Sequence, residues 1–147
     1  MRWLLFLVLF ASCTTQAPLL NETNTTENYG ELVNFTLESL TIPLDGSIVI
    51  TDVNTTKTVY MFAYCDIPLS LVRHDEDGLW RYVYPHIDPC VESTNVTLTP
   101  NMTIPLSSIP TRDGGLTPGV YRLKLFYSTV APATHMRESR IIITITA

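Results

Sequence analysis

The chain has 147 residues, of which 46% are hydrophobic and 16% are charged, and its formal net charge at pH 7 is −5. This is the size of one ordinary domain, and the aromatic content of 10% is enough for a core, which excludes disorder for most of the chain. Only two of the nine basic residues are lysines, and this acidic balance excludes a nucleic-acid partner, because phosphate binding requires clustered Lys and Arg.

The first twelve residues, MRWLLFLVLFAS, carry one basic residue and then an apolar stretch from Trp3 to Phe10. That stretch is too short to cross a bilayer, since a spanning helix needs about 20 residues. A short apolar segment after a basic start is typical of an export signal. We therefore predict a signal peptide over residues 1–12 and an extracytoplasmic location.

The sequence Phe10-Ala11-Ser12-Cys13 resembles the lipobox of bacterial lipoproteins, although Phe10 stands where Leu is usual. Three cysteines in an exported chain leave one without a partner in the chain. Lipid on Cys13 would anchor the protein to a membrane and leave Cys65 and Cys90 to form a disulfide. Ordinary cleavage near Cys13 is the alternative.

The asparagines favour a different origin, because six of the seven stand in N-x-T triplets. Such triplets are acceptors for N-glycosylation at exposed positions of secreted proteins. A secreted eukaryotic or viral glycoprotein is therefore an alternative to a Thr-rich bacterial protein with Asn-Thr turns. The candidate glycosylation sites are Asn21, Asn24, Asn34, Asn54, Asn95 and Asn101.

After the signal, residues 13–30 are polar and predict a flexible tether, and residues 31–147 predict one folded domain. Short alternating strands between Gly, Pro, Asn and Asp turns predict an all-β fold, an antiparallel immunoglobulin-like β-sandwich of 7–9 strands. We expect the strands within residues 33–37, 47–53, 58–65, 69–73, 79–84, 96–99, 102–106, 116–127 and 140–146.

Aromatic residues gather in the strands expected within 58–65 and 79–84. A small sandwich needs most of its aromatic side chains inside, so we expect these residues in the core. If exposed instead, they would form a platform for a sugar or a peptide. The six residues are Tyr60, Phe62, Tyr64, Trp80, Tyr82 and Tyr84.

Tyr121 follows Pro118-Gly119 at the start of a long strand, where immunoglobulin-like folds often place a tyrosine whose hydroxyl bonds the preceding corner. A simple inward-facing aromatic is the alternative. The histidines stand in separate loops, in no zinc-binding pattern, and no nucleophile elbow or phosphate-binding glycine loop is present. We predict no enzyme activity, no catalytic residue, no metal and no cofactor.

Three segments carry a resemblance: VNTTKTVYMFAYC, DEDGLWRYV and LTPGVYRLKLFYS. They resemble small exported bacterial immunoglobulin-like β-sandwich proteins and lipoproteins, and are more distantly similar to the bacterial intracellular proteinase inhibitor (BsuPI-like) family. The resemblance implies an antiparallel sandwich. It implies little about function, because the same fold supports many unrelated functions.

We expect an exported, non-enzymatic module with an interaction or structural role, attached to a bacterial envelope through lipid on Cys13 and in contact with an unidentified protein. One alternative is a proteinase inhibitor that presents a constrained loop, either residues 85–90 or residues 112–115. The other is the secreted glycoprotein.

Overall fold

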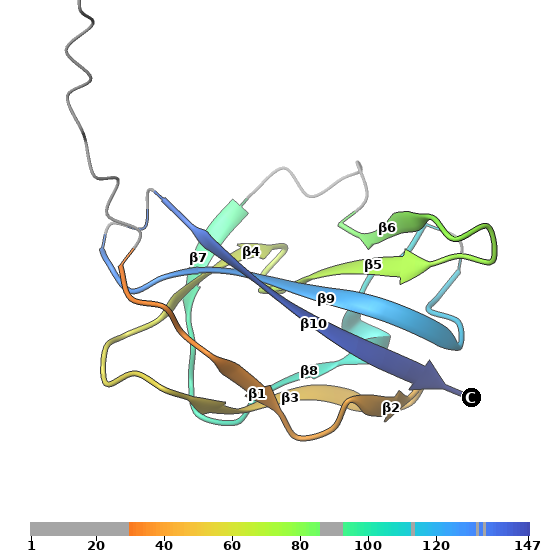
Figure 1. Ribbon diagram of the computed structural model, residues 1–147, viewed down its shortest axis with the longest axis horizontal. Coiled ribbons are helices and arrows are strands. Elements are labelled where there is room, and N and C mark those ends of the chain that lie inside the picture. Colours follow the sequence, from red (N-terminus) through yellow and green to blue (C-terminus); the bar gives the residue numbers. More distant parts are fainter. Residues whose placement is uncertain (1–29, 86–92, 113, 132, 134) are drawn as a thin grey trace, which may run out of the picture.

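The computed structural model describes residues 30–85, 93–112, 114–131, 133 and 135–147. Within these ranges the chain forms ten strands and one 3₁₀ turn, η1 (Leu106–Ser108), and no α-helix. The strands belong to two sheets, which form an upper and a lower layer in Figure 1. The prediction of an all-β chain is confirmed.

The smaller sheet has three antiparallel strands in the order β1-β3-β8. They are β1 (Phe35–Leu37), β3 (Ser47–Val53) and β8 (Met102–Pro105). In β3 the side chains of Ile48 and Ile50 are buried, because alternate residues of a strand point to the same face.

The larger sheet has seven strands, and β9 lies at its centre. Its members are β2 (Thr41–Pro43), β4 (Tyr60–Tyr64), β5 (Ser70–His74), β6 (Trp80–Tyr84), β7 (Ser93–Thr97), β9 (Gly119–Ser128) and β10 (Arg137–Thr146). β10 pairs along one edge of β9, while β4 and β5 share the other edge. β7 then pairs with β4, and β6 pairs with β5.

One hydrophobic core joins the two sheets. The strand β9 contributes Tyr121, Leu123, Leu125 and Tyr127, all of which are buried. Burial of apolar surface contributes about 25 cal/mol for each Å² removed from water. Because these four residues alternate along the strand, burying their side chains sets which face of β9 is inward. The remaining side chains of β9 must therefore point outward.

The first strands are divided between the sheets: β1 pairs with β3, whereas β2 runs parallel to the end of β10. We did not expect β2, and it raises the number of strands above the 7–9 predicted. The reason is physical: β2 has three residues, one of them Pro43, and owes its conformation to pairing with β10. Proline is accepted at such a sheet edge because the edge needs no donor there.

A tight turn, not a continuing strand, follows β4. Tyr64 and Ile67 exchange backbone hydrogen bonds of 3.2 and 2.8 Å, and both residues between them have positive φ, 47° at Cys65 and 64° at Asp66. This is the left-handed two-residue turn that usually takes Asn-Gly. Cys65 is therefore exposed in a turn, and the strand expected within residues 58–65 ends at Tyr64.

Gly30, the last residue of the predicted tether, is held against the fold. Its carbonyl accepts a hydrogen bond of 3.0 Å from Nη2 of Arg137, and the N–H of Glu31 donates to Thr129 Oγ1 at 2.7 Å. The Glu31 carboxylate also lies 2.8 Å from Nζ of Lys57, which lowers its pKa. Residues 30 and 31 are therefore held at the end of the fold where β9 finishes and β10 begins (Figure 1).

Candidate binding surface

The outward face of the larger sheet combines cations with aromatic and aliphatic side chains. On β9, Arg122, Lys124 and Phe126 alternate with the buried core residues and point away from the core. Beside them on β10, Ile142 is paired with Arg122, and Arg140 is paired with Lys124. Residues opposite each other in a sheet share a face, so these five side chains are neighbours.

The β5–β6 hairpin places two further aromatics beside these cations. Val72 is paired with Arg122 on one side and with Tyr82 on the other, which sets Tyr82 and Trp80 of β6 on the same outward face. The guanidinium carbon of Arg122 lies 4.1 Å from the centroid of the Trp80 ring. Lys124 Nζ donates to the Tyr82 hydroxyl at 2.8 Å. We refer to the residues of this face as the cation–aromatic face: Trp80, Tyr82, Val120, Arg122, Lys124, Arg140 and Ile142.

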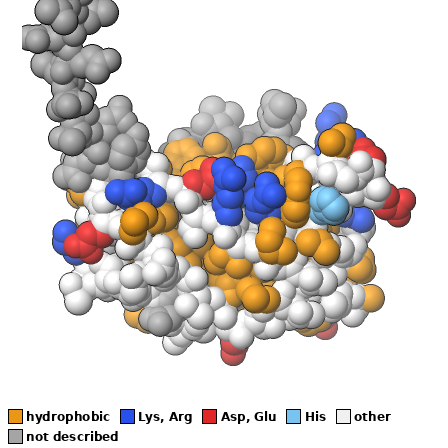
Figure 2. Space-filling view, viewed as in Figure 1, with side chains coloured by type: hydrophobic (Ala, Val, Ile, Leu, Met, Phe, Trp, Pro, Cys, Tyr) orange, Lys and Arg blue, Asp and Glu red, His pale blue; other side chains and the backbone are white. Residues whose placement is uncertain are grey.

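Much of this face is open to solvent. Tyr82 is 57% exposed, Ile142 is 48% exposed and Val120 is 40% exposed, although all three are apolar or largely so. Figure 2 shows Lys and Arg side chains gathered near the middle of the visible face, with hydrophobic side chains beside them. Neighbouring exposed apolar residues on a small protein mark an interaction site.

The charges on the face are unequal. Glu138 is the one carboxylate that contacts it among the described residues, at 3.7 Å from Lys124 Nζ and in contact with Arg140. Arg122 contacts the Trp80 ring and has no carboxylate within 4 Å in the described ranges. Three cations against one carboxylate leave this face positive on a chain whose net charge is −5.

The expectation that the six aromatics of β4 and β6 fill the core is wrong for most of them. Tyr84 alone of the six is buried in the core, and Tyr64 packs partly against it. On β4 the buried residues are Met61 and Ala63, while Tyr60 and Phe62 are half-buried on the opposite side. The outward positions carry the larger rings because the smaller Met and Ala fit between the sheets.

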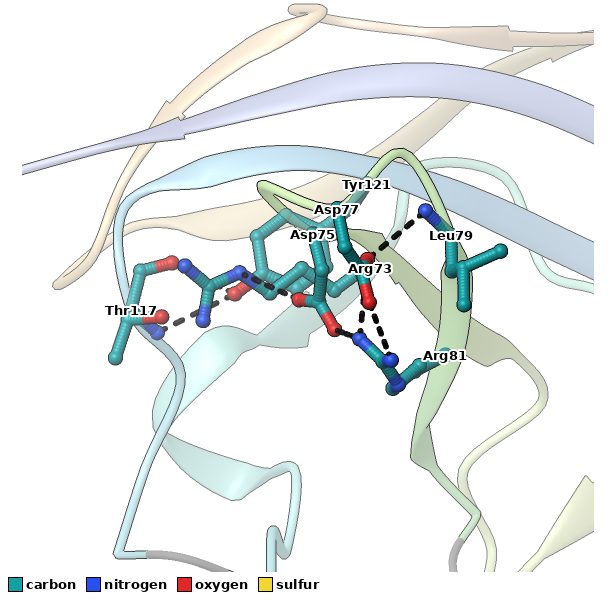
Figure 3. Close-up of polar contacts among 7 residues, drawn as sticks. All are labelled: Arg73, Asp75, Asp77, Leu79, Arg81, Thr117 and Tyr121. Atoms are coloured by element: carbon teal, nitrogen blue, oxygen red, sulfur yellow. Dashed lines mark hydrogen bonds and ion pairs between the residues drawn. The ribbon is translucent and has the colours of Figure 1, made fainter.

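A network of ion pairs lies at the tip of the β5–β6 hairpin, next to the outward aromatics Trp80 and Tyr82. Arg81 Nη2 lies 2.6 Å from Oδ2 of Asp77, and the same guanidinium contacts Asp75. The Asp77 carboxylate also accepts from the Leu79 N–H at 3.0 Å. The hydrogen bond from Arg81 holds the pKa of Asp77 below its ordinary value and raises the pKa of the guanidinium. Figure 3 shows both carboxylates turned toward Arg81.

The tyrosine at the start of β9 closes a neighbouring corner. The Tyr121 hydroxyl donates to the Thr117 carbonyl at 2.7 Å and lies 3.3 Å from the Thr117 N–H, which it can accept. The ring itself is buried. Tyr121 thus makes the contact that the corner interpretation requires while it also serves as an inward-facing core residue. Figure 3 shows this corner beside the hairpin network.

The structure describes some of the other sequence candidates and not the rest. Asn34, Asn54, Asn95 and Asn101 are described, and all four are exposed. Residues 1–29 and 86–92 lie outside the described residues, as does Asp113. The predicted lipid site, the Cys65–Cys90 disulfide and both candidate inhibitory loops therefore stay predictions, because they depend on Cys13, Cys90, residues 86–90 and Asp113.

In the part of the chain that the structure describes, no group of three or more His, Cys, Asp or Glu side chains could hold a metal ion. The carboxylates of Asp75 and Asp77, the acidic pair at the hairpin tip, are instead bound by Arg81. No helix of the described part is long and apolar enough to cross a bilayer.

Comparison of the chain with protein-family models, with curated proteins and with solved structures finds no match. The resemblance to exported bacterial sandwich proteins and to the proteinase-inhibitor family accordingly stays a prediction.

Proposed function

We propose that the chain is an exported, non-enzymatic module that binds a protein partner through the cation–aromatic face. One observation carries the proposal: Trp80 and Tyr82 lie beside Arg122 and Lys124 on an outward sheet face and not in the core. Trp, Tyr and Arg are the residue types that contribute most binding energy at protein interfaces. A face that served only for solubility would not need them together.

The charge of the face indicates the chemistry of the partner. Its three cations meet one carboxylate, so a partner that brings carboxylates gains attraction and faces little repulsion. The exposed apolar side chains of Tyr82, Val120 and Ile142 require apolar groups opposite them. The partner is therefore a protein surface on which carboxylates surround apolar side chains.

A sugar ligand fits this face less well than a protein. Sugars stack on open aromatic faces, whereas one side of the Trp80 ring is covered by the Arg122 guanidinium. The imidazole of His74 lies 4.8 Å from the same ring, centroid to centroid. An Arg held flat on a Trp remains able to bind a carboxylate through the edge of its guanidinium.

The strand order supports an immunoglobulin-like sandwich as the scaffold of this module. The order β1-β3-β8 in one sheet and β4-β9-β10 in the other follows the A-B-E and C-F-G orders of immunoglobulin domains. The Tyr121 corner is a second point of agreement. The β5–β6 hairpin departs from this pattern, because β5 pairs with β9 and β7 is the strand that pairs with the free side of β4.

The proposal includes export because residues 3–10 form a short apolar segment of the kind found in signal peptides. Cys13 is the candidate site for attachment of the chain to a membrane. The second candidate function, proteinase inhibition, depends on loops that include residues outside the described ranges. Arg112 is the described residue of one of these loops and is exposed, so it serves as a probe of that alternative.

Selection from a displayed library of short random peptides against the folded chain tests the proposal. We expect the enriched peptides to combine Asp or Glu with aromatic or aliphatic residues, and their binding to weaken as salt is raised. Counter-selection against a Trp80→Ala, Arg122→Ala variant should remove them. Peptides that survive the counter-selection, or a panel of glycans that binds where the peptides do not, would contradict the proposal.

A further inference from the structure

The four N-x-T triplets among the described residues are accessible to solvent. The four asparagines are exposed, and so are the threonines two positions later, at 36, 56, 97 and 103. The residue between them is never proline, which would block modification. Asn101 has a φ of 56° in the turn before β8, a conformation that asparagine adopts more readily than most residues.

Three of these sites lie at one end of the smaller sheet. Asn34 precedes β1 and Asn54 follows β3, and the pairing of Phe35 with Val53 sets the two asparagines side by side. The N–H of Asn34 donates to Oδ1 of Asn54 at 2.6 Å. A sugar is attached to the other atom of the amide, Nδ2, so this hydrogen bond and the modification of Asn54 are compatible.

Asn101 belongs to the same end. It precedes Met102, which is paired with Ile50 near the end of β3. Glu31 lies at this end too, since it contacts Thr55 and Lys57 just after Asn54. These three sites therefore cluster near Glu31, one of the first described residues of the chain.

The fourth site is on β7, at the edge of the larger sheet. Asn95 is paired directly with Phe62 of β4, so the two side chains lie on the same outward face. The Phe62 ring is half-buried, and its edge contact with Tyr64, at 4.9 Å between centroids, leaves surface that no described side chain covers completely. A sugar attached to Asn95 is within reach of that ring.

We propose that Asn34, Asn54, Asn95 and Asn101 carry N-linked oligosaccharides, and that the first sugar on Asn95 packs against the ring of Phe62. The proposal is independent of the binding function. In the reaction, the amide nitrogen displaces the lipid diphosphate from the anomeric carbon of a lipid-linked oligosaccharide. A C–N bond forms and the anomeric C–O bond breaks. Its electron pair leaves on the diphosphate, and one amide proton passes to a base of the transferase.

The arrangement leaves the cation–aromatic face without sugar. Residues 70–84 and 119–146, which contain β5, β6, β9 and β10, include no asparagine. Oligosaccharides would thus surround two regions, the end of the smaller sheet near Glu31 and the β7 edge of the larger sheet. An edge strand covered in this way is protected from pairing with another chain.

The first test uses the full chain purified from the organism that encodes it. A peptide N-glycanase in heavy-oxygen water converts each glycosylated Asn into labelled Asp and leaves a bare Asn unchanged, and peptide mapping then reads each site. We expect label at all four positions. Bare asparagines overturn the proposal, and diacylglycerol found on Cys13 of the same sample would identify a bacterial lipoprotein.

The second test examines the contact between the sugar on Asn95 and Phe62, in chain secreted from a eukaryotic host. Asn95→Gln should lower the melting temperature by roughly 3 °C in the parent and have no effect in a Phe62→Ala background, because contacting groups are not additive. Phe62→Tyr keeps the ring and should restore the effect. Asn101→Gln is the matched control and should act equally in all backgrounds. Equal effects of Asn95→Gln in every background overturn the contact.

Discussion

The guanidinium of Arg122 lies over the ring of Trp80 with 4.1 Å between its central carbon and the ring centroid, and the two residues come from strands that are not adjacent in the sheet. β5 separates them, and its outward residue Val72 is buried beneath the neighbouring side chains. The contact therefore bridges a strand and holds both side chains in place before a partner arrives. Fixed side chains lose less conformational entropy on binding.

Removal of the corner hydroxyl tests what fixes the start of β9. Tyr121→Phe deletes the donor to the Thr117 carbonyl but keeps the buried ring. We expect a loss of about 1 kcal/mol in the free energy of unfolding, measured in urea, which is the net value of a typical hydrogen bond. Tyr82→Phe is the control, because Tyr82 is exposed and its hydroxyl bonds Lys124 alone among the described residues, and it should leave stability unchanged. Equal stabilities of the two variants would show that the corner contributes nothing.

Two glycines with almost the same backbone conformation allow the cost of a left-handed φ to be distinguished from the cost of a steric clash. Gly30 has a φ of 75° and Gly78 a φ of 79°. A Cβ at Gly30 would lie 2.2 Å from Thr129 Oγ1, whereas one at Gly78 would have nothing within 4 Å. Both Ala variants bear the left-handed penalty of about 1–2 kcal/mol, and Gly30→Ala must also displace Thr129. We expect Gly30→Ala to unfold at the lower urea concentration. The opposite order would mean that residue 30 is not held against the fold.

The hairpin network gives a pH dependence with a defined sign. Because Arg81 lowers the pKa of Asp77 in the folded chain, the network stabilises the fold above the ordinary pKa of Asp, about 4, and this contribution is lost as the pH falls through the lower folded value. Titration of the Asp77 carboxyl by NMR should give a pKa below the ordinary value, and Arg81→Gln should raise it. An unchanged pKa in Arg81→Gln would remove this role of the network.

The cysteine prediction concerns the turn after β4. A bond between Cys65 and Cys90 would close a loop of moderate size and stabilise the fold by about 3 kcal/mol on the loop-entropy model. We expect one Cys65–Cys90 peptide pair in mapping without reductant, and a lower melting temperature after reduction. The Cys65→Ser, Cys90→Ser double variant should match the reduced chain. Two alkylated thiols in the unreduced, exported protein would refute the pairing.

Alternation in the sequence was enough to predict most strands, and β3 was predicted with its observed bounds, 47–53. The strands expected within 69–73 and 79–84 likewise match β5 and β6, which pair with each other. Alternation in β4 could not say which face is inward, because Met61 and Ala63 on one side and Tyr60 and Phe62 on the other are all apolar. Packing against the smaller sheet decides that choice, and it put the aromatics outside.

The cation–aromatic face was hidden in the sequence for the same reason. The alternation of charged and apolar residues in this strand indicates that Arg122 and Lys124 point outward. Their contact with Trp80 and Tyr82 depends on strand register, which is set by the pairing of β5 with both β6 and β9. The turn at Cys65-Asp66 was missed because neither residue is the Asn or Gly that usually marks positive φ.

The measurement that tests the binding proposal most directly is the affinity of a selected acidic peptide for four single variants, determined by titration calorimetry. Trp80→Ala and Arg122→Ala should each weaken binding at least about 30-fold, as the loss of an interface residue worth 2 kcal/mol would. Leu32→Ala, an exposed apolar residue next to Glu31 and outside the face, and Arg112→Ala, an exposed cation of a candidate inhibitory loop, should bind like the parent. Binding that survives Trp80→Ala and Arg122→Ala but is lost in Arg112→Ala would contradict the account and place the site on the loop.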